Sequence, residues 1–203
     1  MDITRIDTYN DERFSKTVLN QHGAYLIFGD PYEIEIISPT DAIVRGSDPG
    51  VYPELIEYFR FHAPQIFRFF NDTGDHIASY SAPEIIDIEL DNIQPSQFFI
   101  DEEKLDAVRS FINDPEDIII QVIPWNDRFI SLDGHTRLYL AVQKGFQSVK
   151  AVISETDDWV WTFVREAEKR GIKSPVDLIL LSHEQYEIQW NRYCDKVFMD
   201  EKQ

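Results

Sequence analysis

The sequence predicts a mixed α/β (α+β) fold, and three observations along its 203 residues support that class. Short runs rich in β-branched and aromatic residues fill much of the N-terminal part. Strand-like and helix-like runs then alternate, and the C-terminal part has helical spacing. We therefore expect an N-terminal α+β lobe over residues 1–82, a core over 83–155, and a helical extension over 156–203 that packs on the core.

The N-terminal lobe contains strand-like runs joined by turn residues. Runs at 24–28, 32–38 and 42–46 are separated by Gly-Asp-Pro and Pro-Thr-Asp, which favour tight turns. This spacing predicts a small antiparallel meander. The run 51–63 places its apolar residues at helical spacing, and the turn residues 72–75 between two further apolar runs indicate a hairpin.

The core begins with a run over 85–95 that alternates apolar and polar residues and stops at proline, so we expect a strand there. Asp101 is a suitable N-cap for a helix over 102–113. The apolar run 117–125 predicts a buried strand, which could pair with a strand over 128–132 across a short turn.

A further helix and strand close the core, and helices follow them. Gly145 is placed to end the helix as its C-cap, before a strand over 148–154. From Asp157 onward the pattern is purely helical. Acids open the first of these helices and basic residues close it, as the helix dipole favours. Ser182 and Gln185 suit a capping box for the second.

Composition and charge exclude several classes of function. There are 37 acidic and 19 basic residues, for a formal net charge of -18, which opposes nonspecific binding to DNA. Cys194 is the single cysteine, so an internal disulfide and a cysteine-based zinc cluster are both excluded. Without a long apolar run or a secretory signal in the sequence, we expect a cytoplasmic protein with no membrane partner.

The segment Asp133-Gly134-His135-Thr136-Arg137 stands between a predicted strand and a predicted helix, and its chemistry suits an anion site. Free N–H groups in the first turn of a helix favour phosphate, and glycine lets it approach closely. Arg137 and Thr136 would add phosphate contacts, and His135 would stabilise charge or transfer a proton. Asp133 would hold Mg²⁺ or orient an attacking hydroxyl.

Each of these residues also has a structural explanation. Asp133 suits an N-cap, Gly134 a turn, and Arg137 a solvated first helical turn. For any single residue the structural explanation is the stronger one. For the cluster we favour a site, because a cap alone does not require both a histidine and an arginine beside it. The other histidines have no metal-ligand spacing; they are His22, His62, His76 and His183.

Residues 85–153 resemble the ParB/sulfiredoxin-like domain, through "IELDNIQPSQFFIDEEKLDAVRSFI" and then "IIIQVIPWNDRFISLDGHTRLYLAVQKGFQSVKAVI". Three branches of that superfamily differ at the motif. Sulfiredoxins have Gly-Cys-His-Arg there, and partition ParB proteins have Gly-Glu-Arg-Arg. Free-serine kinases have Asp-Gly-His-His-Arg, which this chain matches except at Thr136.

The kinase resemblance implies a bound ATP or ADP with Mg²⁺ and a small hydroxylated substrate of the amino-acid type. It also implies a second contact segment at Ser96 and Gln97, near the place where those kinases have a catalytic glutamate. That glutamate is missing, so Asp101, Glu102 or Asp133 would have to act as the base.

Two hypotheses from different classes follow. The first is a nucleotide-binding phosphotransferase or nucleotide hydrolase that uses Asp133 and His135 in catalysis. The second is a noncatalytic regulatory or adaptor module that acts through protein partners, for which the acidic surface and helical extension are suited. A nuclease ranks last, because the sequence offers no cluster of carboxylates to hold two metal ions.

Overall fold

The structure is a computed structural model that describes residues 2–200. It confirms the mixed α+β class. The chain forms two compact units, Met1–Ile85 and Ile86–Gln203, and the C-terminal segment belongs to the same unit as the predicted core. None of the helices within 2–200 has the length and apolar character that crossing a bilayer requires.

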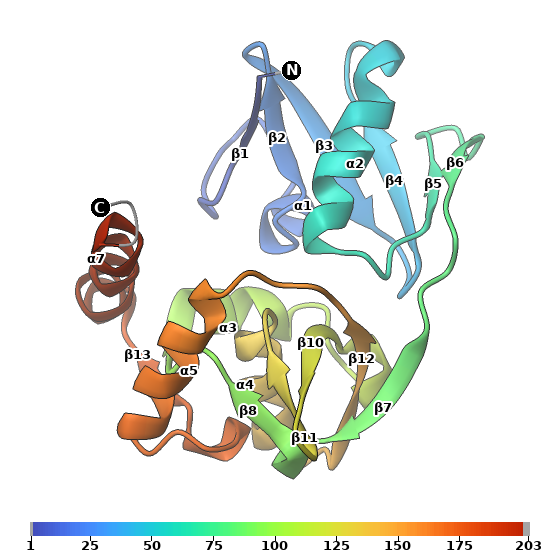
Figure 1. The fold of residues 1–203 in the computed structure, drawn as a ribbon. Coiled ribbons are helices and arrows are strands. Elements are labelled where there is room, and N and C mark those ends of the chain that lie inside the picture. The colour runs from blue at the N-terminus through green and yellow to red at the C-terminus, as the bar shows by residue number, and fades with distance from the viewer. Residues whose placement is uncertain (1, 201–203) are drawn as a thin grey trace. The chain divides into compact units, whose positions relative to one another are not determined.

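The N-terminal unit is built on a six-stranded sheet with its strands in chain order, and Figure 1 shows α2 lying across one face of it. Neighbouring strands are antiparallel except β4 and β5, which are parallel. The elements are β1 (Ile3–Arg5), α1 (Lys16–Asn20), β2 (Ala24–Ile27), β3 (Asp30–Ile36), β4 (Asp41–Arg45), α2 (Tyr52–His62), β5 (Arg68–Phe70) and β6 (His76–Ser79).

The predicted meander and hairpin of this unit are confirmed. Strands β2, β3 and β4 form the meander, and β5 pairs with β6 across the expected turn. Helix α2 connects the parallel strands β4 and β5, and it buries Leu55, Ile56 and Phe59 against the sheet. Strand β1 and helix α1 are two elements that the sequence analysis did not predict.

The C-terminal unit contains a five-stranded sheet in the order β7-β12-β10-β11-β8. Strands β10 and β11 form the predicted antiparallel hairpin, whereas β12 and β8 run parallel to their neighbours β10 and β11. The strands are β7 (Ile85–Glu89), β8 (Ile93–Pro95), β10 (Ile119–Trp125), β11 (Arg128–Ser131) and β12 (Ser148–Ile153).

The expectation of one continuous strand over 85–95 was wrong. A 3-10 turn at Leu90–Asn92 divides the run, and its two halves lie at opposite edges of the sheet. The reason is visible in the apolar spacing, which holds a period of two up to Leu90 and then jumps three positions to Ile93. That jump breaks the alternation that a single strand needs.

Helices cover both faces of this sheet. The helices are α3 (Glu102–Arg109), α4 (His135–Lys144) and α5 (Trp159–Lys169). Leu138 and Ala141 of α4 pack in the same core cluster as Ile120 and Val122 of β10. Val160 and Val164 of α5 pack with Ile130 in a separate cluster on the other face.

The expectation that the chain is purely helical from Asp157 onward was also wrong. A short apolar run after Pro175 forms a strand that pairs in parallel with β9 (Phe99–Asp101). This pairing gives the run a hydrogen-bonded neighbour that local spacing cannot predict. The elements that follow α5 are β13 (Ile179–Leu181), α6 (His183–Tyr186), a π-helix (Glu187–Asn191) and α7 (Arg192–Asp200).

Candidate anion-binding site at the start of α4

Gly134 turns the chain from β11 into α4 and is the N-cap residue of that helix. Its φ is 82°, in the left-handed region that glycine adopts without strain. A Cβ at this position would lie 2.6 Å from the Cγ2 atom of Ile120, so the space also excludes a larger residue. Gly134, rather than Asp133, is therefore the cap, and its carbonyl accepts the N–H of Leu138 at 2.9 Å.

Arg137 holds a fixed position in the first turn of α4. Its Nη1 donates to the carbonyl of Ile119 at 2.6 Å, and its Nη2 donates to Oδ2 of Asp133 at 2.9 Å. The Arg137 side chain is 21% exposed and that of Asp133 is 58% exposed. The guanidinium is thus not a freely solvated group, and its hydrogen bond to Ile119 fixes its orientation in the absence of a ligand. These two bonds use two of its five N–H donors.

His135 points into the protein and binds the loop that follows β8. Its Nε2 accepts the backbone N–H groups of Ser96 and Gln97, each at 3.2 Å. The hydroxyl oxygens of Ser96 and Ser131 lie 3.2 and 3.1 Å from the same nitrogen. A nitrogen that accepts two N–H bonds carries no proton, so the neutral ring with its proton on Nδ1 fits this geometry.

The electrostatics of His135 agree with that assignment. The residue is only 6% exposed. Burial is the largest influence and lowers the pKa of the imidazole to about 4, although the nearby Asp133 carboxylate acts in the opposite direction. The ring therefore stays neutral around pH 7 and fixes the Ser96–Gln97 loop to the start of α4.

The structure thus divides the predicted site residues into two groups. Ser96, Gln97 and His135 come together on the inner side of the turn, and their polar atoms are hydrogen bonded within the fold. The Oγ of Ser96 donates to the carbonyl of Ser131 at 2.8 Å. Asp133 and Arg137 pair on the outer side, where solvent reaches them.

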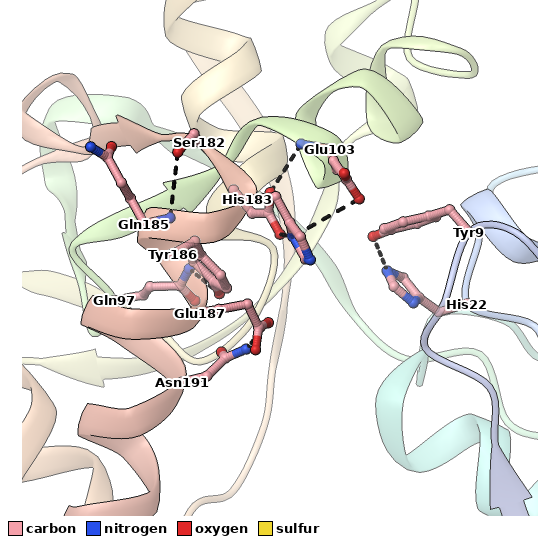
Figure 2. Close-up of polar contacts among 11 residues, drawn as sticks. Tyr9, His22, Gln97, Glu103, Ser182, His183, Gln185, Tyr186, Glu187 and Asn191 are labelled. Carbon is pink, nitrogen blue, oxygen red and sulfur yellow. Dashed lines mark hydrogen bonds and ion pairs between the residues drawn. The ribbon is translucent and has the colours of Figure 1, made fainter.

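Thr136 belongs to neither group, and the side chain of Gln97 extends from the inner group to the C-terminal segment. Thr136 is half-buried in the first turn of α4, beside Arg137. The Gln97 amide donates to the carbonyl of Phe99. It also donates, at 3.2 Å, to the hydroxyl of Tyr186 (Figure 2). Gln97 therefore connects the candidate site to α6 of the C-terminal segment.

A second polar pair, missed by the sequence analysis, joins Asp101 to His183. Asp101 caps α3 as predicted, because its Oδ1 accepts the N–H of Glu103 at 3.0 Å. Its Oδ2 lies 2.8 Å from Nδ1 of His183, whose contact with Glu103 appears in Figure 2. Hydrogen bonding to Asp101 is the largest cause that raises the pKa of His183. The two residues are 82 positions apart, so no spacing pattern could have revealed the pair.

Metal binding at this site would require a bound phosphate. Within residues 2–200, no group of three or more His, Cys, Asp or Glu side chains is arranged to hold a metal ion. Asp133 offers one carboxylate, and Mg²⁺ at nucleotide sites commonly takes one or two carboxylates together with phosphate oxygens and water. Asp133 therefore fits Mg²⁺ only in company with a bound phosphate.

Comparisons with known proteins assign no family to the chain. No family model matches the sequence, and no curated protein matches it. Among solved structures, the chain is similar to protein Atu1540 from Agrobacterium tumefaciens, with 17% sequence identity and a TM-score of 0.34. The similarity covers 48% of this chain and 62% of that one.

Proposed function

We propose that the C-terminal unit binds a nucleotide through its phosphates at the start of α4. The observation that carries this proposal is the guanidinium of Arg137, whose position is fixed by its hydrogen bond to Ile119 and which lies at the positive end of a ten-residue helix. The Nε and Nη2 atoms of Arg137 lie 3.2 Å from where a Cβ of Gly134 would be, so backbone N–H groups and a fixed cation share one turn. ATP and ADP are the nucleotides we favour, because the motif resembles that of free-serine kinases within the ParB/sulfiredoxin-like superfamily.

The proposal gives each residue of the turn a part. Gly134, Thr136 and Arg137 contact phosphate oxygens through backbone N–H, hydroxyl and guanidinium donors. Asp133 holds a phosphate-bound Mg²⁺ or orients the hydroxyl of a small acceptor. His135 positions the loop and does not transfer a proton, because its Nε2 already accepts the N–H groups of Ser96 and Gln97.

A noncatalytic regulatory module is the second candidate, and the environments of His135 and Asp101 favour it. His135 is buried and neutral, and the carboxylate of Asp101 is 1% exposed and bound to His183 and to the α3 N-terminus. Neither group is placed to accept a proton from an external hydroxyl. A module of this kind would bind the nucleotide without turning it over and would respond through protein partners. DNA is an unsuitable partner for either candidate, given the formal net charge of -18.

Calorimetry with ATP, ADP and CTP tests the binding step. We expect Arg137→Ala to abolish nucleotide binding and Arg137→Lys to weaken it, because lysine keeps the charge but not the planar fork. Arg165→Ala, on the exposed side of α5, is the matched control and should bind normally. Thermal unfolding of each variant separates loss of binding from loss of fold. Unchanged affinity in a folded Arg137→Ala variant would refute the proposal.

Product formation then separates the two candidates. A phosphotransferase should form a phosphorylated product from serine or a related hydroxylated amino acid, and Asp133→Asn should retain nucleotide binding but lose that product. A noncatalytic module should bind ATP or ADP and form no product from any such acceptor. Measurement of ADP and inorganic phosphate release in the same samples distinguishes transfer from hydrolysis.

A further inference from the structure

A groove of about 380 Å³ opens at the carboxyl end of α4, away from the candidate phosphate site at the beginning of the same helix. Three segments form its walls: the 3-10 turn after β7, the end of α4 with the turn that follows, and a second 3-10 turn at Pro175–Asp177. Helix α4 has ten residues, so the two ends are roughly 15 Å apart along its axis.

The groove has an apolar floor and an acidic rim. Its apolar lining includes a side chain that is 66% exposed at the lip, Val176, and the set is Leu90, Val142, Phe146, Pro175 and Val176. Glu89 and Asp91 line the rim and are exposed. Among the described residues, neither carboxylate has a hydrogen bond or an ion pair with another side chain. Lys144, the basic residue in the last turn of α4, does not line the groove.

The walls are held in place before anything binds. Nη2 of Arg128 donates to the carbonyls of Asp91 and Ile93 on one wall, at 3.1 and 3.2 Å, and to that of Lys173 near the other, at 2.6 Å. The N–H of Leu90 donates to the carbonyl of Gln147 at 3.0 Å, which joins the first wall to the turn after α4. A preformed groove loses little conformational entropy on binding.

The charge around the groove specifies the occupant. Two carboxylates without a side-chain partner within residues 2–200 lie at the rim, whereas the Arg128 guanidinium is bound to backbone carbonyls of the walls and Lys144, in the last turn of α4, does not line the groove. The rim therefore attracts a cation. The volume is at the small end of ligand sites and the groove is open to solvent, which suits one inserted apolar side chain better than an enclosed small molecule. An apolar side chain with basic neighbours satisfies both the floor and the rim.

We propose that this groove binds a peptide segment of a protein partner, in which one large apolar residue inserts between Leu90, Phe146 and Val176 while flanking Lys or Arg residues pair with Glu89 and Asp91. The proposal does not depend on nucleotide binding, because the groove and the phosphate site share no residue.

The test is a titration of the full chain with the peptide acetyl-KRLLKR-amide, followed by NMR and by fluorescence anisotropy of a labelled copy. We expect chemical-shift changes at Leu90, Val142, Phe146 and Val176, with affinity that falls as salt is added. The peptide acetyl-EELLEE-amide should produce none of these changes. A lack of shift changes at the groove with millimolar basic peptide would overturn the proposal.

Matched charge-reversal variants test whether the acidic rim binds the peptide. The double variant Glu89→Lys/Asp91→Lys should weaken binding about tenfold, since it reverses two exposed charges at the site. The control Glu155→Lys/Glu168→Lys makes the same change in net charge elsewhere on exposed positions, and it should leave affinity within about twofold. Equal losses in the two double variants would reject the groove as the binding site.

The apolar lining is tested at the lip by Val176→Ser, which trims an exposed side chain and should weaken binding several-fold without unfolding the protein. Unchanged affinity in that variant would contradict insertion of an apolar residue. Isoamylamine, a small apolar cation, is the competing ligand: if it displaces the peptide at equal or lower concentration, the groove is a small-molecule site and the peptide assignment is wrong.

Discussion

His135 and His183 belong to the same unit, yet they have opposite environments. His135 is buried and accepts backbone N–H groups, and burial lowers its pKa to about 4. His183 has a side chain that is 46% exposed, and its hydrogen bond to the buried Asp101 carboxylate raises its pKa. The difference shows that the partner decides the function of an imidazole: N–H donors require the neutral ring, whereas a carboxylate favours the cation.

Replacement of each histidine by leucine should give the largest contrast. His135→Leu leaves the N–H groups of Ser96 and Gln97 buried without an acceptor, and we expect a loss of about 2–4 kcal/mol in the free energy of unfolding. His183→Leu removes the exposed partner of the buried Asp101 carboxylate, whose Oδ1 still accepts the N–H of Glu103, so the loss should be smaller, about 1–2 kcal/mol. Urea unfolding at pH 7 measures both. Similar losses in the two variants would break the comparison.

The two histidines should also make opposite contributions to the pH dependence of the free energy of unfolding. The folded-state pKa of His135 is about 4, below its ordinary value of 6.5, so the unfolded chain binds the proton more readily between these values. Its contribution is fully present above pH 6.5 and is lost as the pH falls toward 4, by about 3 kcal/mol in total. His183 has a raised pKa, so its contribution is present below pH 6.5 and is lost as the pH rises through the folded-state value.

NMR titration of the ring resonances measures these pKa values directly. His135 should show no titration between pH 8 and 5.5, and His183 should titrate above 6.5. In Asp101→Asn the His183 midpoint should fall, and His135 should be unaffected because its own partners remain. Titration of His135 near 6.5 in the folded protein would contradict its assignment as a buried neutral acceptor.

The turn that places His135 can be tested with two glycines of α4. Gly134→Ala faces a positive φ and a contact of 2.6 Å with Ile120, so we expect a loss of about 2–3 kcal/mol in unfolding free energy. Gly145→Ala, at the other end of the helix, has a φ of 73° but no atom within 4 Å of the added carbon, and should cost about 1 kcal/mol. Equal losses would mean that backbone strain alone matters and that the Ile120 contact relaxes.

Local chemistry explains what the sequence predicted well. The Asp101 cap, the hairpin of β10 and β11, and the end of α4 at Gly145 each depend on residues within a few positions of one another. The glycine turn before α4 was predicted for the same reason, and it left Asp133 and Arg137 close together on one helical turn.

Long-range pairing explains what the sequence did not predict. The run 85–95 was divided because its halves join different edges of the sheet, and β13 became a strand because β9 was available as its partner. His135 accepts hydrogen bonds from Ser96 and Gln97, which are 39 and 38 positions away in the sequence. The partner of Asp101, His183, is 82 positions away. Such partners are fixed by topology, so a motif could indicate an imidazole near a helix start but not the direction in which it points.

The smallest expected effect is the coupling energy between Asp101 and His183. Asp101→Asn keeps a cap for α3 but loses the charge, and His183→Gln keeps a donor without it. A double-mutant cycle at pH 5.5 should give a coupling of about 0.5–1 kcal/mol, because one partner is buried while the other is solvent-exposed and screened. At pH 9 the coupling should fall toward zero as His183 loses its proton. A coupling that is the same at both pH values would mean that a neutral hydrogen bond, not the charge of His183, joins α6 to β9, and the electrostatic contrast with His135 would then fail.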